Sequence, residues 1–239
     1  MTQRELMDLL ANVEGWLTPR ECWALFACAR RCRGRGAIVE VGSWKGKSTI
    51  VLAAGARDAA RTAVHAIDPH GGIPALGNVP TFDQFTANIA RAGLTDLVRP
   101  HVQTSAEAAA GFKEPVEFIF IDGAHEYELV LKDFECWFPK VLEGGVMAFH
   151  DSVGWPGPRR VVRDRIYRSK YFRRIRFAHS LTYAEKVSAN TALERLANRL
   201  VWWTNQCYAA AVFVGTRPAI KHVIERGRRI VRRSPHARV

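Results

Sequence analysis

Short apolar runs that end at or beside an acidic residue, separated by helical segments, constrain the fold of this chain more than any other feature. They cover residues 37–41, 63–67, 116–121 and 146–149. Uninterrupted apolar runs of this length are typical of strands that are buried on both faces of a parallel sheet. Their alternation with helical segments predicts an α/β fold, a doubly wound and mostly parallel Rossmann-like sheet with helices on both faces.

Three parts of the chain are predicted from the same pattern: an N-terminal helical cap over 1–35, a central domain over 36–216 and a basic C-terminal helix or tail over 217–239. A helix start is expected at Thr18, with Pro19 in the first helical position and Glu21 two residues further on. After Asp151 the pattern loosens. There it predicts strands over 174–177 and 208–214 and a helix over 188–203.

Charge is distributed unevenly along the 239 residues. The net charge is +12; residues 1–150 hold 15 Lys and Arg against 18 Asp and Glu, whereas residues 151–239 hold 20 against 5. A segment this basic suits an anionic partner, and an anionic membrane surface, a nucleic acid and an acidic substrate all remain open. With 48% apolar and 24% charged residues the composition excludes wholesale disorder.

The compartment is predicted from what the chain lacks. The longest apolar runs are too short for a transmembrane helix, and no apolar core of a signal peptide follows Met1. The five cysteines form no C-x-x-C pair, so free thiols in a reducing cytoplasm are expected. We therefore predict a cytoplasmic protein, with peripheral contact to the inner face of the membrane through Trp202, Trp203 and the basic C-terminus as a further option.

Four carboxylates are expected to meet at one edge of the sheet. Each lies at or just past the C-terminal end of a predicted strand, namely Glu40, Asp68, Asp122 and Asp151. Ligands of open parallel sheets bind outside these strand ends. Four acids gathered there repel one another, so a bound ligand or metal is the simplest explanation.

The loop after the first strand distinguishes three kinds of ligand site. The dinucleotide pattern G-x-G-x-x-G is absent, and the P-loop pattern is one residue short between Gly42 and Gly46-Lys47-Ser48. The loop instead matches E-x-G-x-x-x-G, in which glycines let the backbone approach a nucleoside and its amino-acid tail. Asp68, at the end of the second strand, is suitably placed to accept hydrogen bonds from two ribose hydroxyls.

In these residues the chain resembles class I S-adenosylmethionine (SAM)-dependent methyltransferases over about residues 36–152. The segment from Val39 to Ser48 looks like the first SAM motif of that family. The resemblance implies a cofactor site that includes Glu40, Gly42, Ser43, Gly46, Ser48, Asp68, Ser105 and Asp122. Ser105 enters by position only, because it follows a strand predicted over 98–103, where such folds hold the adenine.

A second pair of motifs is more specific. Phe118 to Tyr127 and Gly144 to Asp151 look like the metal-dependent small-molecule O-methyltransferases, most closely the branch with macrocin O-methyltransferase. The resemblance implies that Asp122 and Asp151 ligate a divalent cation, usually Mg²⁺, and that His125 is the general base. One position departs from the family, because His150 stands where an acid is common. His150 is therefore open to three roles: ligand of a softer metal, second base, or hydrogen-bond partner. A metal-free site with His125 or His150 as the base is also open.

Together these features predict SAM-dependent O-methylation of a small hydroxylated acceptor, such as a sugar of a natural product or glycolipid. A cation would lower the pKa of the bound hydroxyl, and an imidazole accepts a proton near neutral pH. The alternative is an RNA-binding protein or RNA methyltransferase that uses the basic C-terminal segment, although no nucleic-acid motif accompanies the charge. The sequence identifies neither the acceptor nor the oligomeric state.

Overall fold

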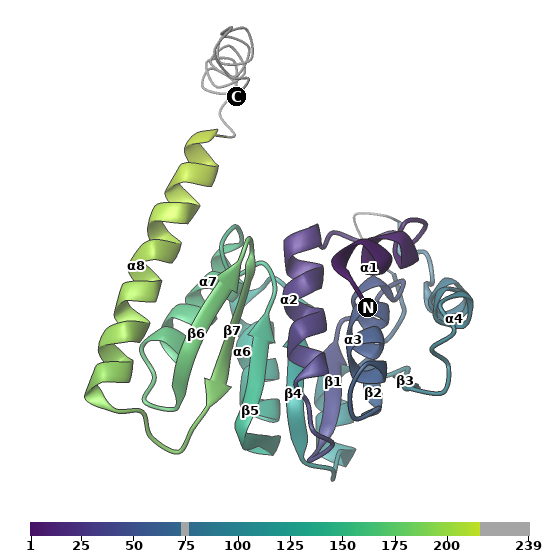
Figure 1. Cartoon of the computed structure of the whole chain (residues 1–239), viewed down its shortest axis with the longest axis horizontal. Helices are drawn as coiled ribbons and strands as arrows, with labels where there is room; N and C mark the ends of the chain where they lie inside the picture. Colours follow the sequence, from purple (N-terminus) through teal and green to yellow (C-terminus); the bar gives the residue numbers. More distant parts are fainter. Residues whose placement is uncertain (73–76, 216–239) are drawn as a thin grey trace, which may run out of the picture.

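The fold is a seven-stranded mixed sheet between two layers of helices (Figure 1). The computed structural model describes residues 1–72 and 77–215. The strand order is β3-β2-β1-β4-β5-β7-β6, with parallel pairing from β3 to β5 and antiparallel pairing of β7 with both β5 and β6. The strands are β1 (Ala37–Val41), β2 (Val64–Ile67), β3 (Val98–His101), β4 (Val116–Ile121), β5 (Val141–Phe149), β6 (Phe172–Ala178) and β7 (Leu181–Lys186). The predicted doubly wound sheet is confirmed.

Successive side chains of β1 and β4 point to opposite faces of the sheet and pack in two separate hydrophobic cores. Ile38, Phe118 and Phe120 pack with the helices α1 (Gln3–Leu9), α2 (Pro19–Arg30), α3 (Lys47–Arg57) and α4 (Phe82–Arg91). Val39 and Ile119 point the other way. They pack with α5 (Ser105–Gly111), α6 (Tyr127–Trp137), α7 (Pro156–Val161) and the π-helical segment Val162–Tyr167. This alternation explains why both strands are apolar apart from one glutamate in each, Glu40 in β1 and Glu117 in β4.

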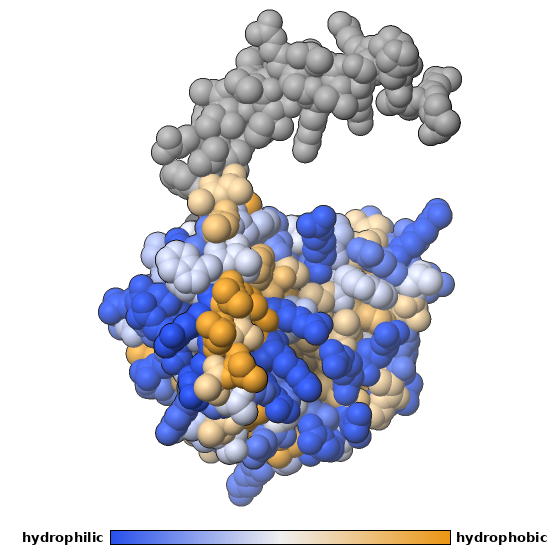
Figure 2. All heavy atoms as spheres, turned by 60° about the vertical axis from the view of Figure 1, so that its left-hand side comes forward, coloured by the Kyte–Doolittle hydropathy of each residue, from blue (hydrophilic) through white to orange (hydrophobic). Residues whose placement is uncertain are grey.

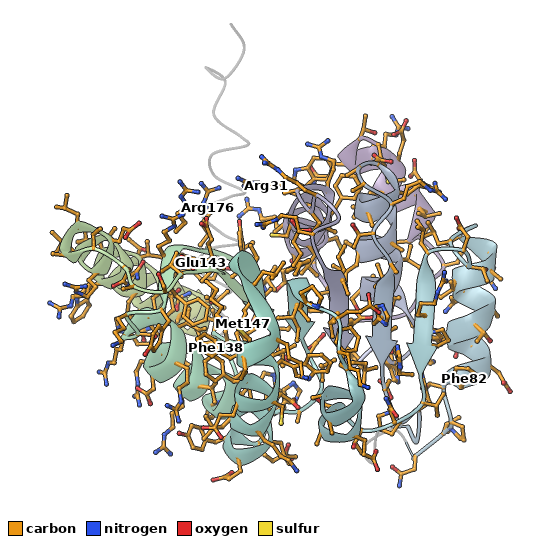
Figure 3. All side chains as sticks on the ribbon, turned by 90° about the horizontal axis from the view of Figure 1, so that it is seen from below. Arg31, Phe82, Phe138, Glu143, Met147 and Arg176 are labelled. Atoms are coloured by element: carbon orange, nitrogen blue, oxygen red, sulfur yellow. The ribbon has the colours of Figure 1, made fainter. Side chains whose placement is uncertain are left out.

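The sheet lies in the middle of the molecule, and its last strands carry the long helix α8 (Ala192–Gly215). Seen from below, Met147 of β5 lies near the centre and Phe82 of α4 lies toward the edge (Figure 3).

The N-terminal helices begin with reciprocal caps: Thr18 accepts a hydrogen bond from the backbone of Glu21, and the Glu21 carboxylate accepts one from the backbone of Thr18. The predicted helix start at Thr18 is confirmed.

Two predictions near the C-terminus are wrong. Residues 208–214, expected as a strand, continue α8, and the helix expected to end at 203 extends to Gly215. No Gly or Pro interrupts residues 192–214, and three consecutive alanines at 209–211 favour the helix. β5 pairs with β4 on one edge and with β7 on the other, and β7 is a strand that the sequence pattern missed. The predicted basic helix over 217–239 lies outside the described residues.

The start of β5 also differs from the prediction. Gly144 and Gly145 were expected to turn into a strand at 146, but they lie inside β5, which begins at Val141. The pairing with β4 jumps from Val116↔Val141 to Phe118↔Val146, and Gly144 has φ +75°. A glycine accommodates this bulge because it lacks a Cβ. The five cysteines are all unpaired, as expected.

Candidate active site

The residues that follow the parallel strands come together at one edge of the sheet. The backbone N–H of Asp122 donates to Val41 O (2.8 Å), and that of His150 donates to Ile121 O (3.1 Å). On the other side of β1, Gly42 N donates to Ile67 O (2.9 Å). These bonds extend the sheet by one residue past each strand. They bring the expected acidic residues to the same edge, where parallel sheets bind ligands.

Glu40 lies beneath the β1 loop, fully buried. Its Oε2 accepts a hydrogen bond from the hydroxyl of Thr49 in α3, a residue the sequence analysis did not single out. Burial raises the pKa of Glu40 to about 8. Among the described residues, neither Glu40 Oε1 nor the hydroxyl of Ser43 has a hydrogen-bond partner. Because buried polar atoms are normally paired, these two atoms point to a ligand that would satisfy them.

Two glycines shape the loop between β1 and α3. Gly42 has φ +88°, and a Cβ there would lie 2.4 Å from the carbonyl oxygen of Asp122. The β1 and β4 loops can therefore approach this closely only with glycine at position 42. Gly46, with φ +86°, directly precedes α3, whose second residue is Ser48. A Cβ at position 46 would lie 3.1 Å from the Phe85 ring, so Gly46 also allows the loop to pack against α4.

Asp68 faces this loop from the end of β2. Its Oδ2 accepts a hydrogen bond from Trp44 N (2.8 Å), and its Oδ1 accepts one from His70 N (2.6 Å). Both contacts are to neutral backbone donors, and each carboxylate oxygen keeps a lone pair for a further donor. Asp68 is thus held in place by the loop that carries Gly42.

On the other side of the edge, Asp122, His150 and Asp151 form a compact cluster. His150 Nδ1 lies 3.1 Å from Asp122 Oδ1 and 3.5 Å from Asp151 Oδ2. One ligand atom from each residue lies within 4.8 Å of the others, a spacing that suits a shared metal ion. Asp151 has φ +53°, a conformation uncommon outside glycine and typical of functional sites.

Glu21 completes the cluster, and sequence reasoning missed it. The side chain is 1% exposed, and its Oε1 lies 3.3 Å from His150 Nε2. The same oxygen accepts a hydrogen bond from Ser180 N (2.9 Å) and lies 3.4 Å from His179 Nδ1. The capping motif at Thr18 had already accounted for Glu21, so no further role was sought. Its burial beside a histidine could be known only from the fold.

The charges of this cluster depend on one another. Burial opposes ionisation of Glu21, but its contacts with His150 and Thr18 outweigh burial and lower its pKa to about 2. Burial likewise opposes protonation of His150, but Asp122, Asp151 and Glu21 together raise its pKa to about 12. Three carboxylates around one ring therefore favour a positive charge at its centre.

His125 lies at the rim of the cluster and is more accessible. Its Nε2 lies 2.8 Å from Asp151 Oδ2, and its side chain is 41% exposed. The ring stacks on Trp155 with centroids 4.1 Å apart. Because an ionised carboxylate only accepts hydrogen bonds, Nε2 carries the proton and Nδ1 keeps the free lone pair. Asp151 and Trp155 together fix the orientation of the His125 ring.

Ser105 begins α5, after β3. Its hydroxyl accepts a hydrogen bond from the indole Nε1 of Trp137 (3.0 Å), so the side chain already joins α5 to α6. Its role beside an adenine remains a prediction.

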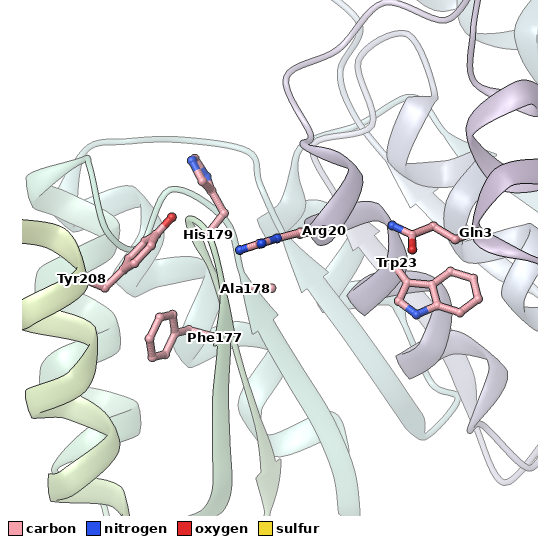
Figure 4. Close-up of a pocket in the computed structure, with 7 residues that line it drawn as sticks. All are labelled: Gln3, Arg20, Trp23, Phe177, Ala178, His179 and Tyr208. Carbon is pink, nitrogen blue, oxygen red and sulfur yellow. The ribbon is translucent and has the colours of Figure 1, made fainter. Parts of the chain in front are cut away.

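A cavity of about 510 Å³ opens beside Glu21, between the N-terminal helices and the β6–β7 turn (Figure 4). Aromatic and polar side chains line it: Gln3, Arg20, Trp23, Phe177, Ala178, His179 and Tyr208. His179 connects the cavity to Glu21, and Glu21 connects to His150. His179 and the buried Glu21 therefore lie between the cavity and the Asp122–His150–Asp151 cluster.

Comparison with known proteins finds methyltransferases. Residues 39–152 match a family described as a methyltransferase domain. The O-methyltransferase NovP superimposes with a TM-score of 0.62 at 19% identity, covering 74% of this chain and 84% of NovP. TomG, an O-methyltransferase of tomaymycin synthesis from Streptomyces achromogenes solved with SAM, gives 0.54 at 17% identity, covering 78% and 89%. A Bacillus cereus O-methyltransferase in complex with SAH gives 0.53 at 20% identity, covering 77% and 90%. The expected resemblance to SAM-dependent methyltransferases is confirmed by the match over residues 39–152, whereas the metal-dependent branch stays a prediction.

Proposed function

Because residues 39–152 match a methyltransferase domain and the fold resembles that of O-methyltransferases, we propose that the chain is a class I SAM-dependent enzyme that methylates a hydroxyl group of a small molecule with the help of a divalent cation and a histidine base. The observation that carries this proposal is the sharing of one sheet edge by two dissimilar sites. Gly42 and Asp68 lie on the β1–β2 side, and Asp122, His150 and Asp151 lie on the β4–β5 side. The first site suits a nucleoside, and the second suits a cation and an oxygen nucleophile.

For the cofactor we assign the β1 loop, the start of α3 and the Asp68 carboxylate. Asp68 accepts the ribose hydroxyls through the lone pairs that Trp44 and His70 leave free. The unpaired oxygens of Glu40 and Ser43 supply further polar contacts beneath the loop. The remaining expected contacts, with Gly46, Ser48, Ser105 and Asp122, are part of the same proposal.

For the cation we assign Asp122 and Asp151, with His150 Nδ1 as the third ligand atom. The three donors lie close enough for one ion, and Glu21, whose Oε1 lies 3.3 Å from Nε2, would help to position the ring. A divalent cation in this position lowers the pKa of an acceptor hydroxyl and orients it. An imidazole among the donors fits Mn²⁺, Fe²⁺ or Zn²⁺ better than the expected Mg²⁺, which prefers oxygen.

For the base we assign His125. Nδ1 takes the proton of the acceptor hydroxyl while Asp151 holds the ring through Nε2. The acceptor oxygen then attacks the methyl carbon, the bond from that carbon to sulfur breaks, and S-adenosylhomocysteine leaves. Positioning of the oxygen in line with the methyl group supplies much of the rate. The aromatic and polar cavity beside Glu21 is our candidate for acceptor entry.

The test combines cofactor binding with turnover. Calorimetry should show SAM binding to the purified protein, and a panel of hydroxylated glycosides and phenols should contain an acceptor that incorporates the labelled methyl group. Chelation with EDTA should abolish turnover, and Mn²⁺ or Mg²⁺ should restore it. Turnover that survives both chelation and Asp122→Ala would remove the metal from the mechanism. Absence of SAM binding would contradict the whole proposal.

The alternative of an RNA acceptor is not favoured, since the compared structures are O-methyltransferases. Within the described part of the chain, no helix has both the length and the apolar character needed to cross a bilayer. The cytoplasmic location remains a prediction.

A further inference from the structure

The helix α8 presents large apolar side chains to solvent. Leu193, Leu196, Leu200 and Trp203 are 78%, 54%, 59% and 67% exposed. Their spacing of three, four and three residues places them on one side of the helix. Figure 2 shows this apolar strip over α8 with hydrophilic side chains on both flanks. Exposed apolar side chains gathered in this way mark an interaction surface.

The side of α8 that faces the domain carries amides as well as apolar side chains. The Asn198 side chain donates to Phe172 O (2.9 Å), and Asn205 is buried although its Nδ2 has no partner among the described residues. Val201 and Trp202 pack against the core from the same side. The helix therefore turns amides inward and leucines outward, the reverse of what burial of apolar surface favours. The apolar strip needs an explanation other than the fold of this domain.

A basic cavity adjoins the strip. It measures about 460 Å³ and is lined by four arginines and three aromatic residues: Arg163, Arg168, Arg195, Arg199, Tyr167, Trp202 and Trp203. Asp164 is the carboxylate that pairs with Arg163 and Arg168. Among the described residues, no carboxylate pairs with Arg195 or Arg199, and both are exposed. Trp203 belongs to both the strip and the cavity, so the two features form one continuous surface.

The charge next to the strip decides which partner fits. Residues 216–239, which follow α8 in the sequence, contain eight Lys and Arg and one Glu. Phosphate groups of an anionic bilayer complement the arginine cavity and this basic segment, while the leucines enter the acyl region and tryptophan lies at the headgroup level. A second copy packed along α8 would cover the leucines but would leave the arginines without a partner. We propose that α8 and its arginine cavity dock this methyltransferase on an anionic phospholipid surface.

The proposal is tested by flotation of the full chain with vesicles. Vesicles of phosphatidylcholine with 30 mol% phosphatidylglycerol should bind the protein, and pure phosphatidylcholine should bind at least about tenfold more weakly. Leu196→Ser with Leu200→Ser should lower binding to anionic vesicles by at least about tenfold, because the exposed apolar contact is lost. Arg195→Gln with Arg199→Gln should lower it by a similar factor and flatten its dependence on salt.

Matched controls separate docking from bulk charge and hydrophobicity. Arg91→Gln with Arg99→Gln removes two charges near the opposite edge of the sheet, and Val102→Ser with Leu129→Ser removes two exposed apolar side chains away from α8. Both controls should bind vesicles as the wild type does. Unchanged SAM affinity in every variant checks that each one is folded.

Two results would overturn the proposal. Equal vesicle binding by the leucine variant and the wild type would mean that the basic C-terminal segment acts without α8. A dimer in light scattering that the leucine variant dissociates, combined with no preference for anionic vesicles, would assign the strip to a second copy of the chain.

Discussion

The two sides of the candidate active site hold their carboxylates in opposite ways. On the β1–β2 side, Asp68 accepts hydrogen bonds from backbone N–H groups and Glu40 accepts one from a hydroxyl. On the β4–β5 side, Asp122 and Asp151 face imidazole rings. Neutral donors hold Asp68 in place without cancelling its charge, whereas an imidazole can exchange its proton for a cation. On our proposal the first side therefore suits hydroxyl groups, and the second side suits a cation that replaces a proton.

The largest effect is expected from Asp151→Asn. It removes a ligand of the proposed cation and the partner that orients His125, so methyl transfer should fall by about 10³-fold or more. SAM affinity should stay within about threefold, because Asp151 lies on the other side of the edge. Turnover under saturating SAM measures the rate of methyl transfer, and calorimetry measures the affinity for SAM. An equal loss of rate and of affinity would mean that the two sides of the site do not act separately.

The converse change is Asp68→Asn. An amide donates where the carboxylate accepts, so SAM affinity should fall by about 10- to 100-fold, as expected for lost hydrogen bonds to a charged group. Binding of Mn²⁺, followed by electron paramagnetic resonance, should not change. Weakened Mn²⁺ binding in this variant would mean that the β1–β2 side also contributes to cation binding on the β4–β5 side.

A smaller effect is expected from Glu21→Gln. Glutamine retains the helix cap with Thr18 but holds the His150 ring less firmly, so Mn²⁺ affinity should fall by about tenfold. Glu128→Gln, at an exposed position of α6, is the matched control and should bind Mn²⁺ normally. If Glu21→Gln binds Mn²⁺ as tightly as the control does, Glu21 does not position His150.

The same comparison shows what can be predicted from sequence. β1 and β4 match their predicted bounds, because strands buried on both faces are continuous apolar runs. Asp68 and Asp122 follow such runs, so their meeting at one edge was predictable from topology alone. The strand predicted over 208–214 failed because a short apolar run fits a buried strand and a helix equally well.

Contacts across distant segments could not be predicted. Glu21 meets Ser180, 159 positions away, and this contact depends on how α2 packs beside the antiparallel β6–β7 pair. Thr49 was missed for a similar reason, since any small polar residue early in α3 looks like surface. Its burial against Glu40 is a property of the packed helix.

The last effect concerns Glu40 and is seen in stability, with neither binding nor turnover as the readout. Its pKa in the folded protein, about 8, lies above the ordinary value of 4.5 because the side chain is buried, so the folded state holds this proton more tightly than the unfolded state. The resulting stabilisation is complete below about pH 4.5 and is lost as the pH rises toward 8. The loss amounts to about 1.4 kcal/mol per pH unit for one group.

Urea unfolding of the wild type and of Glu40→Gln at pH 5.5, 6.5 and 7.5 should therefore show the wild type losing stability relative to the variant by that slope. Glu128→Gln, which changes an exposed acid, should run parallel to the wild type. Parallel curves for Glu40→Gln as well would mean that Glu40 is ionised in the folded protein, and the β1–β2 side would then carry as much charge as the β4–β5 side.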